Sequence, residues 1–183
     1  MELLDALSQT FDHAGKIVGG VKTTQLGAPT PCTEWDVQTL VAHTLGVIVN
    51  MGRGARGEEL LAHTSLALDA DLGTQFRAET DRTLAAWIDH GLDGDVNVGA
   101  GPMPARAAIS VNLVDSTTHS WDIARATGQD AHLPDELAAT VLAVGRGFIT
   151  DDLRKRVGFD APVPVARDAG PTDQLVAFLG RQP

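Results

Sequence analysis

Apolar residues recur at three- and four-residue steps along most of the chain, which is the pattern of amphipathic α-helices. A first helix is predicted over about residues 2–20, and VQTLVAHTLGVIVNMG predicts a second that runs to the glycines at 52 and 54. A third runs from Thr74 to about His90, and a fourth from about Ala105 to Ala126, closed by Gly128. Two shorter helices, PDELAATVLAVGRGFI and PTDQLVAFLG, follow.

The segments between these helices have turn chemistry. GAPTPCTEWD contains two prolines, and Thr33 is predicted as an N-cap with Asp36 three residues later, an acidic variant of the capping box. RGARGEELLAHTSLALDADLG indicates a long crossover, Val96–Val98 a short extended piece, and APVPVA a strand-like piece near the end. No repeat or linker interrupts the pattern, so we expect an all-α bundle in a single domain over residues 1–183.

Composition narrows the classes of function. The formal net charge is -10 and the pI about 4.8, so the protein should repel phosphate backbones and anionic lipid, and we expect no nucleic-acid partner. No apolar run approaches the length of a membrane span and no leader pattern is present, which predicts no membrane association and a cytoplasmic location. The single cysteine, Cys32, excludes a multi-cysteine zinc site, so a metal must use His and carboxylate.

Asp115 and His119 stand four residues apart in the fourth predicted helix, within VDSTTHSWDIARATG. Side chains at i and i+4 project from one helix face, so both can reach a single point beside it. With 24 acidic residues and six histidines in 183 positions, roughly 0.8 such pairs arise by chance. A second pair, Glu59 and His63, lies in the crossover, where an exposed ion pair explains it.

The surroundings of Asp115 and His119 distinguish them from a chance pair. Leu113 and Val114 precede them and Trp121, Ile123 and Ala124 follow, which predicts a turn packed inside the bundle. A carboxylate buried there needs a cation. From the spacing alone, an Asp–His hydrogen bond or a solvated face remains the alternative, and only a third ligand would favour a metal site.

Three stretches carry a resemblance to a known family: TPCTEWDVQTLVAHTLG at 30–46, VDSTTHSWDIARATGQD at 114–130 and LVAFLGRQP at 175–183. They resemble the DinB-like and mycothiol-dependent maleylpyruvate isomerase superfamily of metal-binding helical bundles, most closely an actinobacterial metal-binding branch. The resemblance implies a DinB-like four-helix bundle with a long crossover and short additional C-terminal elements. That superfamily places one His on the second helix and an acid-x-x-x-His or His-x-x-x-His pair on a later helix, around a divalent ion.

The resemblance also implies a ligand set for this chain. His43 matches the histidine of the second helix, and His119 matches the histidine of the pair. Asp115 stands where the isomerase has Glu and many DinB-like members have His, and it remains a hard oxygen ligand. The implied metal site is His43, Asp115 and His119, which leaves a position open for water or substrate and suits Zn²⁺ best. Ni²⁺ or another divalent first-row ion is the alternative.

The function implied is that of a divalent-metal-binding protein, acting as a mycothiol- or other thiol-dependent transferase or isomerase on a small electrophile. Its partners would be a small-molecule substrate or a low-molecular-weight thiol, because a bound metal can lower the pKa of a thiol. The chain is too short for the additional C-terminal domain of the full-length isomerase, and no residue is assigned a catalytic role. The alternative is a non-catalytic metal-binding or stress-related interaction protein with a structural or vestigial site. Bundles of this kind often form dimers, so a homodimer is the oligomer to test.

Residues near the implied ligands have less defined roles. Asp122 could orient the imidazole of His119, and a salt bridge to Arg125 is an equal alternative. Trp35 and Trp121 could wall the metal pocket, although core packing is the default for tryptophan. Asn50 and Asn112 are polar pocket groups without an assigned role, and Asp36 is assigned to the helix start. For Cys32, a structural role in the TPCTEW turn is favoured over a role as a nucleophile.

Overall fold

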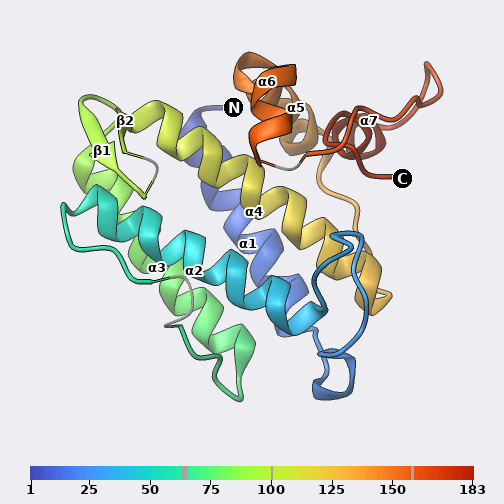
Figure 1. The fold of residues 1–183 in the computed structure, drawn as a ribbon, viewed down its shortest axis with the longest axis horizontal. Coiled ribbons are helices and arrows are strands. Elements are labelled where there is room, and N and C mark those ends of the chain that lie inside the picture. The colour runs from blue at the N-terminus through green and yellow to red at the C-terminus, as the bar shows by residue number, and fades with distance from the viewer. Residues whose placement is uncertain (63–65, 100, 158) are drawn as a thin grey trace. The chain divides into compact units, whose positions relative to one another are not determined.

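The chain is mostly helical (Figure 1) in the computed structural model, which describes residues 1–62, 66–99, 101–157 and 159–183 and leaves out the side chains of 156 and 157. The elements of these residues, in chain order, are α1 (Leu3–Gly19), the short 3-10 helix η1 (Thr23–Gln25), α2 (Val37–Ala55), α3 (Leu72–His90), β1 (Asp95–Asn97), β2 (Pro102–Pro104), α4 (Ala105–Thr127), α5 (Asp135–Phe148), α6 (Asp151–Val157) and α7 (Pro171–Phe178). None of the described helices combines the length and the apolar character that a membrane span requires.

Helices α1 to α4 form a four-helix core. Both α1 and α2 pack against α3 and α4 (Figure 1). Apolar residues of all four helices are buried. Leu7, Phe11 and Ala14, which the periodicity of α1 marks as one stripe, are buried. Burying a side chain of this kind fully contributes about 1.5–3 kcal/mol for a Leu or Phe, so the stripes hold the bundle together. The all-α class and the long crossover between α2 and α3 are confirmed.

Helix α2 begins later than the predicted cap. Its N-cap is Asp36, whose carboxylate accepts a hydrogen bond from the Thr39 N–H at 2.8 Å. Within the preceding loop, the Thr30 hydroxyl donates to the Trp35 carbonyl at 2.8 Å and holds Thr33 in a turn. The prediction of Thr33 as N-cap is therefore wrong, whereas the assignment of Asp36 to the helix start holds.

Capping also defines the ends of α3 and α4. The Asp71 carboxylate accepts a hydrogen bond from the Thr74 N–H at 2.9 Å, so α3 starts at Leu72, ahead of the predicted Thr74. Helix α4 ends at Thr127, and Gly128 follows with a φ of 69° in the left-handed region that favours glycine. The predicted closure of this helix at Gly128 is confirmed.

The hairpin β1–β2 connects α3 to α4. Val96 pairs with Met103 in an antiparallel register, which confirms a short extended piece near Val96–Val98. Gly54, in the last turn of α2, lies close enough to the hairpin that a Cβ would come within 2.5 Å of the Asn97 carbonyl oxygen. Because α4 starts directly after this hairpin, α2 and α4 run antiparallel (Figure 1).

The contacts divide the chain into two units, residues 2–131 and residues 132–183 with Met1. In the second unit α5 packs against α7. The strand-like reading of APVPVA is wrong, because no strand is assigned in 161–166 and the Val163 N–H donates to the Ala177 carbonyl of α7 at 2.9 Å. Its two prolines lack the N–H that a ladder needs. A single domain over 1–183 stays a prediction.

Candidate metal centre

The interface of α2 and α4 brings together the three side chains that the sequence analysis selected. His43 lies in the second turn of α2, and Asp115 and His119 lie one turn apart on α4. Because these helices pack antiparallel, the imidazole from α2 faces the pair on α4. One possible ligand atom from each of the three residues lies within 4.8 Å of the other two.

The Asp115 carboxylate is the centre of this cluster. Its Oδ1 is 3.7 Å from Nε2 of His43 and 3.5 Å from Nε2 of His119. The two imidazole rings meet edge to face, with centroids 5.1 Å apart. Donor atoms that surround zinc in a tetrahedron at about 2.0–2.2 Å lie about 3.3–3.5 Å from one another. The two separations from Asp115 Oδ1 are close to that arrangement.

The donor set also fits a divalent ion electrostatically. The second oxygen of the Asp115 carboxylate, Oδ2, is buried and has no hydrogen-bond partner among the described residues. An ionised carboxylate that is partly shielded from water in this way favours a nearby cation. Two ring nitrogens and one carboxylate oxygen could hold such an ion and leave one position open, but they do not determine which metal it is.

Asp122 contacts His119 on the side of the ring that faces away from Asp115. Its Oδ2 lies 3.3 Å from His119 Nδ1, and the Asp122 side chain is fully buried. If this contact holds a proton on Nδ1, Nε2 is the ring nitrogen that faces Asp115 and that could exchange its own proton for an ion. Of the two roles considered for Asp122, orientation of His119 is therefore the one the geometry supports. Arg125 lies over the Trp121 ring, 5.2 Å from its centroid.

Trp35 covers the imidazoles from the loop before α2. Its ring centroid is 4.5 Å from that of His43 and 6.1 Å from that of His119. The Thr30 hydroxyl, which bonds the Trp35 carbonyl, also accepts from the Cys32 N–H at 3.1 Å and fixes this loop. The prolines and polar residues of TPCTEW thus serve to place an aromatic wall beside the site.

Proximity shifts the protonation of the α4 pair. Burial by itself raises the pKa of the Asp115 carboxyl, but His119 and then His43 outweigh it and hold that pKa below its usual value. Burial likewise lowers the pKa of His119, but the Asp115 carboxylate, with a smaller contribution from Asp122, raises it to about 9. Without a bound ion, the pair is a carboxylate beside an imidazolium. An ion would take the place of the proton between them.

Two polar residues of α4 went without a role in the sequence analysis. The sequence pattern marks Asn112 only as a pocket group and does not distinguish Ser116. Both are fully buried, and the Asn112 amide and the Ser116 hydroxyl have no hydrogen-bond partner among the described residues. Asn112 stands three residues before Asp115, and Ser116 stands four residues after Asn112. These helical spacings are the sequence signal that could have found them.

Other polar candidates lie outside this cluster. The Asn50 amide donates to the Leu61 carbonyl at 3.0 Å and accepts from the Leu61 N–H at 2.8 Å, so it fastens the crossover to α2. His63 falls outside the described residues, and the Glu59–His63 pair stays an untested interpretation.

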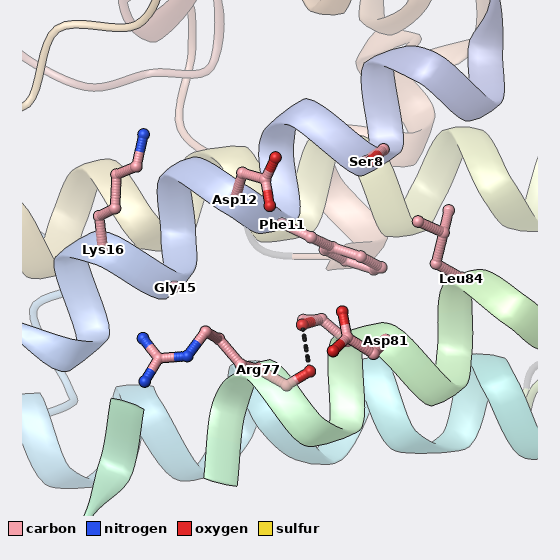
Figure 2. Close-up of a pocket in the computed structure, with 9 residues that line it drawn as sticks. Ser8, Phe11, Asp12, Gly15, Lys16, Arg77, Asp81 and Leu84 are labelled. Carbon is pink, nitrogen blue, oxygen red and sulfur yellow. Dashed lines mark hydrogen bonds between the residues drawn. The ribbon is translucent and has the colours of Figure 1, made fainter. Parts of the chain in front are cut away.

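A pocket of about 250 Å³ lies between α1 and α3, away from the three candidate ligands (Figure 2). Asp12 and Lys16 reach it from α1, and Arg77 and Asp81 from α3. Figure 2 shows Lys16 and Arg77 toward one end, with the two carboxylates nearer Phe11. The four charged side chains are exposed to solvent, so hydration can satisfy them without a ligand.

Comparison with known proteins is consistent with this architecture. Two uncharacterized proteins of Mycobacterium tuberculosis, from strains CDC 1551 / Oshkosh and H37Rv, are each 32% identical over 192 aligned positions, covering 99% of this chain and 98% of theirs. A crystal structure of the mycothiol-dependent maleylpyruvate isomerase superposes with a TM-score of 0.56 at 18% identity, covering 78% of this chain and 68% of that one. At this identity the match establishes the fold alone, and the predicted DinB-like bundle is confirmed.

The family assignment follows from a model that spans most of the first unit. The model of the mycothiol maleylpyruvate isomerase N-terminal domain matches residues 7–124, a range that includes His43, Asp115 and His119. This range exceeds half of the chain. The protein belongs to the mycothiol maleylpyruvate isomerase N-terminal domain family.

Proposed function

We propose that the protein binds a divalent metal ion, with zinc as the best fit, through His43, Asp115 and His119. One observation carries the proposal: ligand atoms from two helices converge within 4.8 Å around a carboxylate whose second oxygen is buried and has no hydrogen-bond partner in the part of the chain that the structure describes. A salt bridge between Asp115 and His119 would explain the position of His119. It does not explain why His43 also approaches the same carboxylate oxygen, at 3.7 Å.

The proposed activity is that of a thiol-dependent transferase or isomerase acting on a small electrophile, with mycothiol or another low-molecular-weight thiol as cosubstrate. The family assignment and the fold of the mycothiol-dependent isomerase support it. A bound ion would supply Lewis acidity that lowers the pKa of a thiol. Three protein ligands leave one position for that thiol, which is the arrangement of a catalytic rather than a structural site.

The chain's own residues would orient and shield this chemistry. Asp122 holds the proton on His119 Nδ1, which keeps Nε2 available as a ligand. Trp35 covers the His43 ring and excludes water from one side of the site. Asp115 balances part of the positive charge of an ion, so that a thiolate still finds net positive charge there.

The first test is elemental analysis of purified wild-type protein beside His119→Ala. We expect about one equivalent of zinc in the wild type and none in the variant, because a single protein ligand removed from a three-ligand site abolishes tight binding. His90→Ala is the matched control, since this histidine lies at the end of α3 and contacts Trp87 and the Gly91 carbonyl. Equal metal content in the wild type and His119→Ala would disprove the site.

The second test separates the thiol-dependent activity from the non-catalytic alternative. Cobalt-substituted protein is titrated with mycothiol, and with cysteine as a smaller thiol, while the visible absorption is followed. A thiol that occupies the open position should add a sulfur-to-cobalt charge-transfer band. An unchanged spectrum with both thiols would favour a structural or vestigial site in a metal-binding or interaction protein.

A further inference from the structure

Four buried polar atoms that have no hydrogen-bond partner among the described residues belong to three residues of α4. They are Nδ2 and Oδ1 of Asn112, Oδ2 of Asp115 and Oγ of Ser116. Asn112 and Ser116 are fully buried. Buried polar groups in native proteins are nearly always hydrogen-bonded, because an unmade bond costs the desolvation of each group. Four such atoms within five consecutive residues therefore require an explanation.

Other buried polar residues nearby show that these atoms are exceptions. The remaining buried hydroxyls of α4 each donate to a carbonyl of their own helix: Thr117 to Leu113, Thr118 to Val114, Ser120 to Thr117 and Thr127 to Ile123. On the facing helix, both ends of the Asn50 amide are bonded to Leu61. The hydroxyl of Ser116 and the side-chain amide of Asn112 make no such bond among the described residues.

The helical spacing brings the unpartnered atoms onto one face. Asn112 and Asp115 are related as i and i+3, and Asn112 and Ser116 as i and i+4, the two spacings at which helical side chains are neighbours. The chemistry of the four atoms is complementary. Ser116 Oγ–H is a donor and Asn112 Oδ1 an acceptor, while Asn112 Nδ2–H is a donor and Asp115 Oδ2 an acceptor. Two hydrogen bonds would satisfy all four.

We propose that Ser116 and Asn112 are positioning residues that hold the Asp115 carboxylate for the metal ion. After rotation of their side chains, the Ser116 hydroxyl donates to Asn112 Oδ1, and the Asn112 amide donates to Asp115 Oδ2. With Oδ2 held in this way, Oδ1 is left facing the two imidazoles, from which it lies 3.5 and 3.7 Å. Asp115 then mirrors His119, whose distal nitrogen is held by Asp122. The inference rests on the proposed metal site.

The test compares zinc affinity in three variants by competition with a chromophoric chelator. Asn112→Leu keeps the side-chain size but removes both polar ends, and we expect zinc to bind about tenfold to a hundredfold more weakly. Ser116→Ala should weaken binding in the same direction by a smaller factor. Ser120→Ala is the matched control, because it makes the same change beside His119 in the chain but removes a hydroxyl that bonds to the backbone.

The hydrogen bonds from Ser116 to Asn112 and from Asn112 to Asp115 form a relay. Zinc uptake by the wild type and zinc affinity of the variants distinguish failure of this relay from failure of the metal site. If the wild type takes up no zinc, the proposed function fails and the inference with it. If the wild type binds zinc and Asn112→Leu binds within twofold of it, only the relay is overturned. Should Asn112→Leu not fold, Ser116→Ala decides: zinc affinity equal to that of Ser120→Ala overturns the relay. The relay bond is read directly by ¹⁵N NMR, where the Asn112 side-chain amide protons should shift in Ser116→Ala and stay unchanged in Ser120→Ala.

Discussion

The α2–α4 interface and the α1–α3 pocket both carry charged side chains, but the charges are shielded from water at the interface and exposed to water at the pocket. Between α1 and α3, Lys16, Arg77 and two carboxylates are exposed to water around a pocket of about 250 Å³ (Figure 2). Between α2 and α4, one carboxylate and two imidazoles converge within 4.8 Å, and His119 is only 8% exposed. The first region shows dispersed, hydrated charge, and the second shows concentrated, shielded charge.

Burial, more than the number of charges, distinguishes the candidate site from the pocket. A hydrated ion needs no protein partner, since exposed ion pairs contribute little. The negative charge of a shielded carboxylate must be balanced, here by a protonated imidazole or by a metal ion. Each of these partners changes the pKa values of Asp115 and His119 and the stability of the protein. The comparison therefore predicts large effects of pH and substitution at the α2–α4 interface and small effects at the α1–α3 pocket.

The largest expected effect is that of pH on zinc affinity. The pKa of His119 is raised to about 9, so at pH 7 an ion must displace a proton from this ring. Apparent zinc affinity should rise about tenfold per pH unit from pH 7 toward pH 9, or about a hundredfold in all. The measurement is a chelator competition across this pH range. A flat profile would mean that His119 is neutral at pH 7 or is not a ligand.

The metal-free protein should respond to pH in the opposite direction. The folded-state pKa of His119 lies above the ordinary value of 6.5, so its stabilising contribution is full below pH 6.5 and is lost as pH rises through about 9. The loss in free energy of unfolding should be about 3 kcal/mol, measured by urea denaturation in the presence of a chelator. His119→Ala is the control, because it should lack this decline.

A smaller effect on zinc affinity is expected when Asp122 loses its charge. Asp122→Asn keeps the size of the side chain but weakens its hold on His119 Nδ1, so zinc should bind about tenfold to a hundredfold more weakly. The same chelator competition measures it. Arg125→Gln is the matched control, because Arg125 lies over the Trp121 ring and should leave zinc affinity unchanged. Equal losses in both variants would instead assign Asp122 to a salt bridge with Arg125.

The sequence predicted the helices well because their periodicity is a local property. It was less successful where a second segment decides the structure. Thr33 has the chemistry of an N-cap, but the bonds of Thr30 to the loop move the cap to Asp36. APVPVA has the composition of a strand, but a strand needs a partner, and this segment contacts α7 with a single backbone bond from Val163. Neither interaction is visible in local sequence.

The metal site shows the same limit. Spacing along one helix related Asp115 to His119, but it could not select His43 from the other histidines, because that choice depends on the packing of α2 against α4. The resemblance to a known family supplied His43. The sequence marks Asn112 only as a polar pocket group and does not single out Ser116. The structure shows that both residues are buried and that, among the described residues, their side-chain polar atoms have no partner, unlike those of Ser120 or Asn50.

The smallest effects are expected at the α1–α3 pocket. Arg77→Gln and Asp81→Asn each remove an exposed charge, so each should change the free energy of unfolding by less than about 0.5 kcal/mol and leave zinc affinity unchanged. Urea denaturation and the chelator competition check both. A change above 1 kcal/mol in either variant would mean that this pocket compensates charge internally, as the α2–α4 interface does. Burial would then no longer separate the two regions, and the pocket would itself need a ligand to explain it.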